Sequence, residues 1–118
     1  MEFIENQPIY MQIADNFCEN ILLEKWKANE RIPSVRDIAV TMEVNPNTAM
    51  RAFVYLQEKD IIYNKRGIGY FVAEEGYQRA LELRRAEFIQ KDLPALMKTM
   101  KLLDISCDEM EALYNENE

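Results

Sequence analysis

Amide, hydroxyl and guanidinium side chains lie close together in the middle of the chain, at Asn45, Asn47, Thr48 and Arg51. Such groups can read base edges in DNA: amides pair with adenine, a guanidinium pairs with guanine, and threonine bonds phosphate or touches a thymine methyl group. Asparagine is also a preferred helix cap, so a cap explains Asn45 as well as a base contact does. Asn47, Thr48 and Arg51 have no such structural explanation, and we predict that they contact DNA.

Arg36 stands where a cation is unfavourable, in the expected first turn of a helix, because the helix dipole is positive at that end. A DNA phosphate would offset this unfavourable placement. The alternative is a surface salt bridge with Asp37 or Glu43, which would contribute little stability. We therefore predict that Arg36 binds a phosphate.

A basic turn, residues 64–69, joins two runs of β-branched and aromatic residues. It carries Lys65 and Arg66 together with Gly67 and Gly69. Two explanations for the glycines stay open: the turn needs positive backbone dihedrals, or bare backbone lets DNA approach closely. We predict that all four residues contribute to DNA binding.

The chain offers little for catalysis or metal binding. It contains no histidine, and its two cysteines, Cys18 and Cys107, lie far apart with no partnered spacing. This disfavours zinc sites and Cys/His catalysis, and the carboxylates show no paired arrangement for acid-base work. We expect no enzyme, no metal and no cofactor, with both cysteines reduced and an intermolecular disulfide as the alternative.

Short helices must position these polar residues. Apolar residues recur at every fourth position after Pro8, which predicts a first helix that ends near Trp26. Pro33 prevents this helix from continuing. Ser34, followed three residues later by Asp37, forms a capping-box pattern, so a second helix is expected to start at Ser34.

A third helix and a hairpin complete the predicted DNA-binding part. Asn45 caps a helix that begins at Pro46 and ends at about Lys59, and with the second helix it makes a helix-turn-helix pattern. The strand-like runs 61–63 and 70–72 follow directly. A hairpin in that place is a wing, and its basic tip is unusual in an acidic protein.

The chain after Ala73 is expected to be helical and to form a dimer interface. One helix is predicted to end before Asp92-Leu93-Pro94, and a second helix follows. A capping-box pattern at 106–109 starts a short last helix. Five apolar residues offer more surface than this tail can cover against itself, which favours a symmetric dimer. They are Leu81, Phe88, Leu96, Met100 and Leu103.

The formal net charge of −7 is the main objection to a nucleic-acid partner, because DNA binding usually needs a basic footprint. Contacts with DNA are local, however, and the acidic residues concentrate at both ends of the chain. Positive residues gather in the middle segment, at Arg31, Arg36, Arg51, Lys59, Lys65 and Arg66.

The run from Pro8 to Val72 resembles the DNA-binding domain of the GntR family of bacterial regulators. The turn at 44–48, with the sequence Val-Asn-Pro-Asn-Thr, is similar to that of the YtrA subfamily, whose members carry a small helical dimerisation segment instead of a large effector domain. The segments that align with the family's sequence pattern are Pro8-Ile9-Tyr10, Gln12-Ile13, Ile32-Pro33-Ser34-Val35-Arg36, Ile38-Ala39, Thr48, Arg51-Ala52, Leu56 and Gly67-Ile68-Gly69-Tyr70-Phe71-Val72.

The resemblance has implications for the DNA contacts and for the mode of regulation. Glu43 and Asp60 stand where the family usually has glycine, and both add negative charge near the expected DNA face. Members of the YtrA subfamily often repress neighbouring transporter genes, so repression is the expected mode. The DNA contacts that the resemblance implies are Arg36, Asn47, Thr48, Arg51, Arg66, Gly67 and Gly69.

We expect an α+β, mostly helical chain of 118 residues, with a winged helix-turn-helix domain at 1–75 and a short helical dimerisation segment at 76–118. The expected function is transcription regulation through a two-fold related double-stranded DNA operator, bound by a homodimer. A protein-interaction module is the alternative, although aromatic anchors would then be expected instead of a basic wing. A small-molecule effector stays an open question.

The start of the chain lacks a signal peptide, and no apolar stretch approaches the roughly 20 residues needed to span a bilayer. We therefore expect a cytoplasmic protein with no membrane partner.

Overall fold

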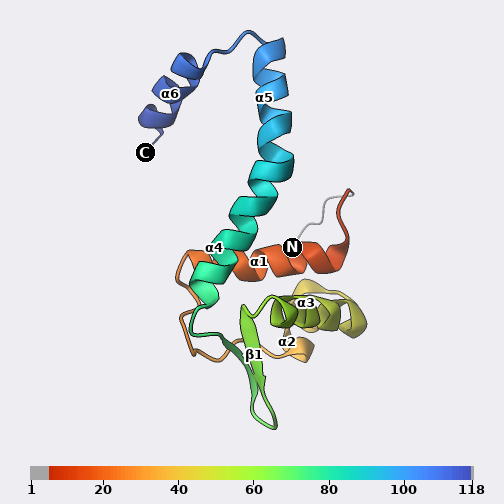
Figure 1. Ribbon diagram of the computed structural model, residues 1–118. Coiled ribbons are helices and arrows are strands. Elements are labelled where there is room, and N and C mark those ends of the chain that lie inside the picture. The colour runs from red at the N-terminus through yellow and green to blue at the C-terminus, as the bar shows by residue number, and fades with distance from the viewer. Residues whose placement is uncertain (1–5, 118) are drawn as a thin grey trace. The chain divides into compact units, whose positions relative to one another are not determined.

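The computed structural model describes residues 6–117, so the start of the chain, where the sequence predicts no signal peptide, lies outside the described residues. The described part is mostly helical with one two-stranded antiparallel sheet (Figure 1), which confirms the predicted fold class. The chain forms two compact units, Met1–Arg84 and Arg85–Glu118. The predicted functional division after residue 75 stays a prediction. Within the described residues, no helix is both long enough and apolar enough to cross a membrane.

Three helices open the larger unit: α1 (Ile9–Leu22), α2 (Val35–Met42) and α3 (Pro46–Glu58). Helix α1 ends before its predicted end near Trp26. The cause is local, since Glu24 has a left-handed φ of 59° and its N–H bonds to the Ile21 carbonyl at 3.0 Å. A residue in that conformation cannot continue a right-handed helix.

Polar side chains cap α2 and α3, as their spacing predicts. The Ser34 hydroxyl accepts a hydrogen bond from the Asp37 N–H at 3.1 Å, and the Asp37 carboxylate accepts one from the Ser34 N–H at 3.2 Å. This confirms the capping box, with Ser34 as the cap and Val35 as the first helical residue. The Asn45 side-chain oxygen accepts from the Asn47 N–H at 2.8 Å and caps α3.

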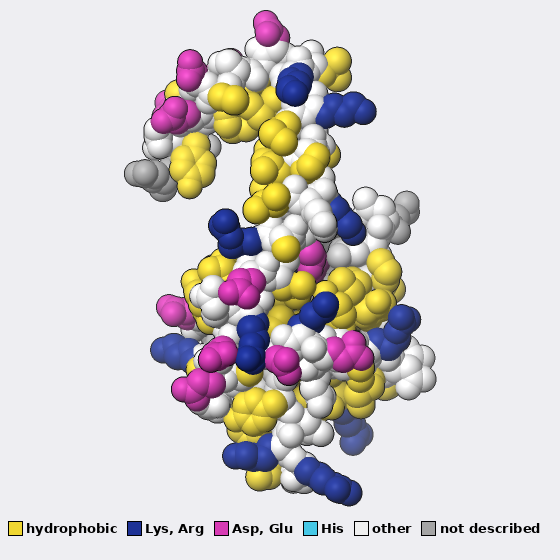
Figure 2. Space-filling view, in the orientation of Figure 1, with side chains coloured by type: hydrophobic (Ala, Val, Ile, Leu, Met, Phe, Trp, Pro, Cys, Tyr) yellow, Lys and Arg dark blue, Asp and Glu magenta, His cyan; other side chains and the backbone are white. Residues whose placement is uncertain are grey.

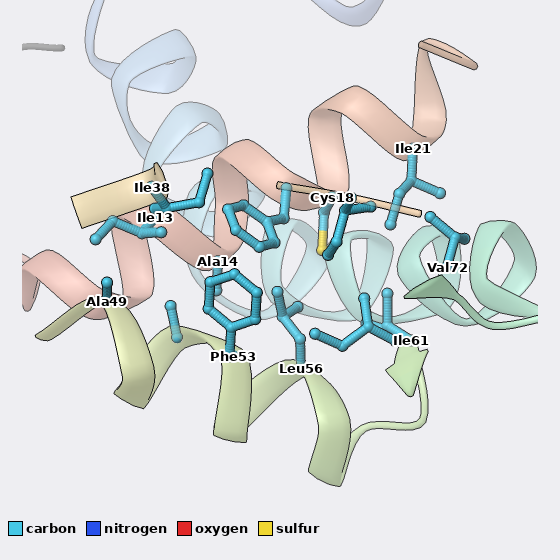
Figure 3. Close-up of a cluster of buried hydrophobic side chains, with 14 of the residues drawn as sticks. Ile13, Ala14, Cys18, Ile21, Ile38, Ala49, Phe53, Leu56, Ile61 and Val72 are labelled. Atoms are coloured by element: carbon cyan, nitrogen blue, oxygen red, sulfur yellow. The ribbon is translucent and has the colours of Figure 1, made fainter. Parts of the chain in front are cut away.

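One apolar core joins these helices to the wing (Figure 3). The Phe53 ring of α3 packs edge-to-face against Phe17 of α1, with centroids 5.1 Å apart, and against Tyr70 of the wing at 4.7 Å. Phe17 also packs against Trp26 at 5.0 Å, so the turn after α1 belongs to the same core. The largest fully buried side chains are Phe17, Phe53, Ile13, Ile21, Leu56, Ile61, Ile62, Val72 and Cys18.

The predicted wing is an antiparallel hairpin of β1 (Ile62–Lys65) and β2 (Gly69–Val72). The segment before α2 pairs with the other edge of β2, where the Ile32 N–H bonds to the Tyr70 carbonyl and the Val72 N–H to the Glu30 carbonyl, both at 3.0 Å. Strand β2 is therefore paired on one edge with β1 and on the other with residues 30–32, which lead into the helix-turn-helix.

The tail contains α4 (Gly76–Glu87), a π-helical turn (Phe88–Asp92), α5 (Leu93–Leu102) and α6 (Cys107–Glu116). The α-helix α4 ends before Asp92 and a second α-helix follows, as predicted, but no break separates them, because the helical backbone continues through the π turn into α5. The Leu93 N–H bonds to the Phe88 carbonyl, five residues earlier. This wider turn accommodates a proline that lacks a donor and would crowd an ordinary α-helical turn. The predicted cap of α6 is present, since the Ser106 hydroxyl accepts from the Glu109 N–H at 3.1 Å.

Glu43 stores backbone strain at the end of α2, where its φ is 55° and its ψ is 49°. We predict that Glu43→Gly raises the free energy of unfolding by about 0.5–1 kcal/mol, since glycine tolerates left-handed dihedrals that cost other residues about that much. The measurement is urea denaturation of the full chain. Glu19→Gly is the control, because Glu19 is exposed in the last turn of α1, where glycine should lower the free energy of unfolding by up to about 1 kcal/mol. A loss at both positions would contradict the prediction.

Candidate nucleic-acid interface

The start of α3 presents its polar side chains to solvent. One side of the helix faces the core, where Ala49, Ala52 and Phe53 are buried. Asn47 and Arg51 are exposed and Thr48 is half-buried. The helix therefore offers an amide, a hydroxyl and a guanidinium within its first two turns, where a recognition helix enters the major groove.

Asn45 is engaged as the cap of α3, because its side-chain oxygen accepts the Asn47 N–H. The cap interpretation of Asn45 is thus present in the structure, and a base contact by its amide stays a prediction. An N-terminal helix end with an exposed amide beside it also favours a nearby phosphate electrostatically.

Arg36 is exposed in the first turn of α2. Within residues 6–117 it makes no ion pair with Asp37 or Glu43, and the Asp37 carboxylate instead accepts the Ser34 N–H. The salt-bridge alternative is therefore not seen, and the Arg36 guanidinium is available to an external anion.

The wing carries its basic residues at the tip, where dark blue side chains are visible in Figure 2. Arg66 is exposed. The Lys65 ammonium lies 5.3 Å from the centre of the Phe71 ring, which in turn stacks on Tyr63 at 5.5 Å. An aromatic pair on the strands thus supports one of the two cations of the tip.

The two wing glycines differ in their surroundings. Gly67 has a φ of +81°, and a Cβ there would meet no atom within 4 Å. Gly69 has a φ of +147°, and a Cβ there would lie 2.9 Å from Nε of Arg31. Both positions therefore need glycine for the turn, and Gly69 also leaves room for a neighbouring guanidinium.

Sequence reasoning assigned Arg31 no role beyond its charge. Arg31 forms a β-bridge with Phe71, which brings its guanidinium against Gly69 at the base of the wing tip. In the sequence, Arg31 is marked only by its position just before Ile32. No short-range pattern predicts that residues 30–32 pair with β2. The structure thereby adds a cation to the basic wing.

The predicted dimerisation residues are divided between the two units. Leu81 is half-buried in the larger unit, whereas the other four lie in Arg85–Glu118. In that smaller unit no described residue of the π turn, α5 or α6 is buried. Phe88 is 47% exposed, Leu96 41% and Leu103 61%, so apolar side chains face outward along this unit.

A helix-turn-helix whose second helix has an exposed polar start, followed directly by a basic hairpin, defines the winged helix-turn-helix class of DNA-binding regulators. Within the described residues, no cluster of three His, Cys, Asp or Glu side chains could hold a metal ion. The family model of the bacterial regulatory proteins of the gntR family matches residues 9–72, and the chain belongs to this family.

Known proteins are similar in sequence to this chain over different shares of its length. The transcriptional regulator YhcF of Bacillus subtilis is 30% identical over 92% of this chain and 88% of its own length. The transcriptional repressor YtrA of the same organism is 35% identical over 64% of this chain and 58% of its own. A crystal structure assigned to the GntR family from Bacteroides thetaiotaomicron is 44% identical, covers 92% of this chain and 94% of its own, and superimposes with a TM-score of 0.73. The resemblance to GntR regulators and to YtrA is thus confirmed.

The contact between Arg31 and Gly69 generates a stability prediction. Gly69→Ala should lower the free energy of unfolding by about 1–3 kcal/mol through backbone strain and the close contact with Nε. Arg31→Ala should recover about 0.5–1 kcal/mol of that loss, because it removes the contact and leaves the strain. The measurement is a double-mutant cycle by urea denaturation.

Gly67→Ala is the matched control, since its methyl group would enter open space. Arg31→Ala should recover nothing of its loss. The same recovery at both glycines, or none at Gly69, would show that Arg31 does not constrain the wing.

Proposed function

We propose that the protein is a transcriptional repressor that binds a two-fold related double-stranded DNA operator as a homodimer. The observation that carries the proposal is the exposed polar start of α3 beside a basic wing, in a chain with a net charge of −7. Random placement of charge in so acidic a chain would not favour a cationic tip. Repression is supported by the relative YtrA, which is named a repressor.

Each residue of this surface has a proposed task. Asn47, Thr48 and Arg51 read base edges, since their side chains match the donors and acceptors of the major groove. Arg36 binds phosphate from the start of α2. Asn45 caps α3 and keeps its amide beside the groove.

The wing completes the proposed contact with DNA. Lys65 and Arg66 bind phosphates, and the bare backbone at Gly67 and Gly69 lets the tip lie close to the duplex. Phosphate contacts position the protein, and base contacts specify the site.

The homodimer is supported by the smaller unit, whose described helices have no buried residue. A helix pair without its own core must cover its apolar side chains with another surface, because exposed apolar area is costly in water. A second copy supplies an identical apolar surface and a two-fold axis. Two winged units related by that axis match an operator with two half-sites.

Salt dependence tests the wing contact. Arg66→Ala should weaken binding to a duplex selected by the wild-type protein from a random library, and it should lower the salt slope by about one unit because one phosphate contact is lost. Its melting temperature should stay nearly unchanged, since Arg66 is exposed.

Lys98→Ala is the control, because it removes one exposed positive charge from α5, outside the proposed DNA surface. It should leave the slope unchanged. If wild-type affinity does not change with salt, the DNA-binding proposal fails and a protein partner is favoured instead. If wild-type binding depends on salt but Arg66→Ala changes neither the affinity nor the salt slope, the wing has a structural role and does not contact DNA through Arg66.

The dimer is tested by one matched pair of substitutions in α5. Leu96→Glu should shift the full chain from dimer toward monomer in sedimentation equilibrium, because a carboxylate would be buried in an apolar interface. Ala95→Glu adds the same charge to the neighbouring exposed residue on another face of the helix, and it should sediment as wild type. Equal effects of the two substitutions, or a monomeric wild type, would refute the tail as the dimer interface.

A further inference from the structure

The guanidinium of Arg51 rests on an aromatic ring that belongs to a different helix. Its central carbon lies 4.1 Å from the centre of the Tyr10 ring, at the start of α1. Tyr10 is half-buried and packs edge-to-face against Tyr55 of α3, with centroids 6.4 Å apart and ring planes at 70°. Tyr55 thus supports the ring on which Arg51 lies.

Among residues 6–117, the Tyr10 ring is the one aromatic or charged partner of the Arg51 guanidinium. Within residues 6–117, Arg51 makes no ion pair and no side-chain hydrogen bond. An exposed arginine otherwise samples many rotamers, and fixing such a side chain costs up to about 2 kcal/mol of conformational entropy. The stack therefore limits the orientations of Arg51 before any DNA is present.

A ring holds an arginine differently from a carboxylate. Stacking uses the face of the planar guanidinium, whereas its N–H donors point outward in the plane. A carboxylate partner would occupy two of those donors and cancel the charge. Tyr10 can therefore orient the side chain and leave its donors free for the O6 and N7 atoms of a guanine.

We propose that Tyr10 is a positioning residue for Arg51 and determines specificity from outside the recognition helix. The proposal rests on the function proposed above, in which Arg51 reads a base. It holds that the ring presets the guanidinium plane for a bidentate contact, so that binding to the correct base requires less ordering. The opposite possibility is that the stack is a resting place that Arg51 must leave, in which case removal of the ring would strengthen binding.

The experiment measures affinity of the full chain for the duplex selected by wild type and for duplexes that differ at single positions. Arg51→Ala identifies the position that Arg51 reads, where discrimination should fall. Tyr10→Leu keeps an apolar side chain without a π face, and discrimination at that same position should fall about 2- to 10-fold while binding to random DNA stays unchanged. Tyr10→Phe keeps the ring and should behave as wild type.

A double variant separates positioning from general structural effects. In the Arg51→Ala background, Tyr10→Leu should cause no further loss of discrimination. If Tyr10→Leu unfolds, as judged by its melting temperature, Tyr10→Met takes its place, because methionine adapts to irregular packing. Wild-type discrimination in a folded variant without the ring, stronger binding by it, or the same loss in the double variant as in wild type would each overturn the inference.

The two proposals fail in different ways. If Arg51→Ala keeps full discrimination at every position, its proposed base contact is wrong and the positioning role falls with it. If Arg51→Ala loses discrimination and Tyr10→Leu does not, the base contact stands and only the positioning role is wrong.

Discussion

The buried Phe53 ring links helix α3 to the wing. It is fully buried in α3 and packs edge-to-face against Phe17 of α1 and Tyr70 of β2. Protein cores are close-packed, so a ring with neighbours on both sides leaves little freedom to the elements that carry it. The polar start of α3 and the cations of the hairpin are therefore displayed by a single rigid body, which a surface that must fit a duplex requires.

Charge is the second constraint, because the chain as a whole repels DNA. Three basic side chains near the proposed DNA surface lie against rings or against the wing instead of a carboxylate: Arg51 lies on Tyr10, Lys65 lies over Phe71, and Arg31 lies against Gly69. An aromatic ring holds a cation without neutralising it, whereas an acidic partner would cancel the charge that attracts a phosphate. An acidic protein can thus keep a local cationic surface. Because that surface is exposed to solvent, added salt screens its attraction to phosphate.

The smaller unit differs from the larger one in how its apolar side chains are covered. Its helices leave apolar side chains exposed, and no described residue of the π turn, α5 or α6 is buried; the proposed homodimer would cover these side chains. The π turn before Pro94 keeps the helical backbone continuous where proline would otherwise interrupt it.

Features that depend on neighbours a few residues apart can be predicted from the amino-acid sequence. Short-range patterns predict the helical periodicity, the capping box at Ser34, the hairpin with its basic tip, and the family. Caps and turns can be predicted in this way because their hydrogen bonds join residues only a few positions apart. No sequence pattern predicts that Arg31 lies against Gly69 or that Arg51 lies on Tyr10, and both contacts become visible only in the folded chain. These contacts join segments far apart in the chain, and packing of the shared core, rather than any local pattern, brings them within reach of each other.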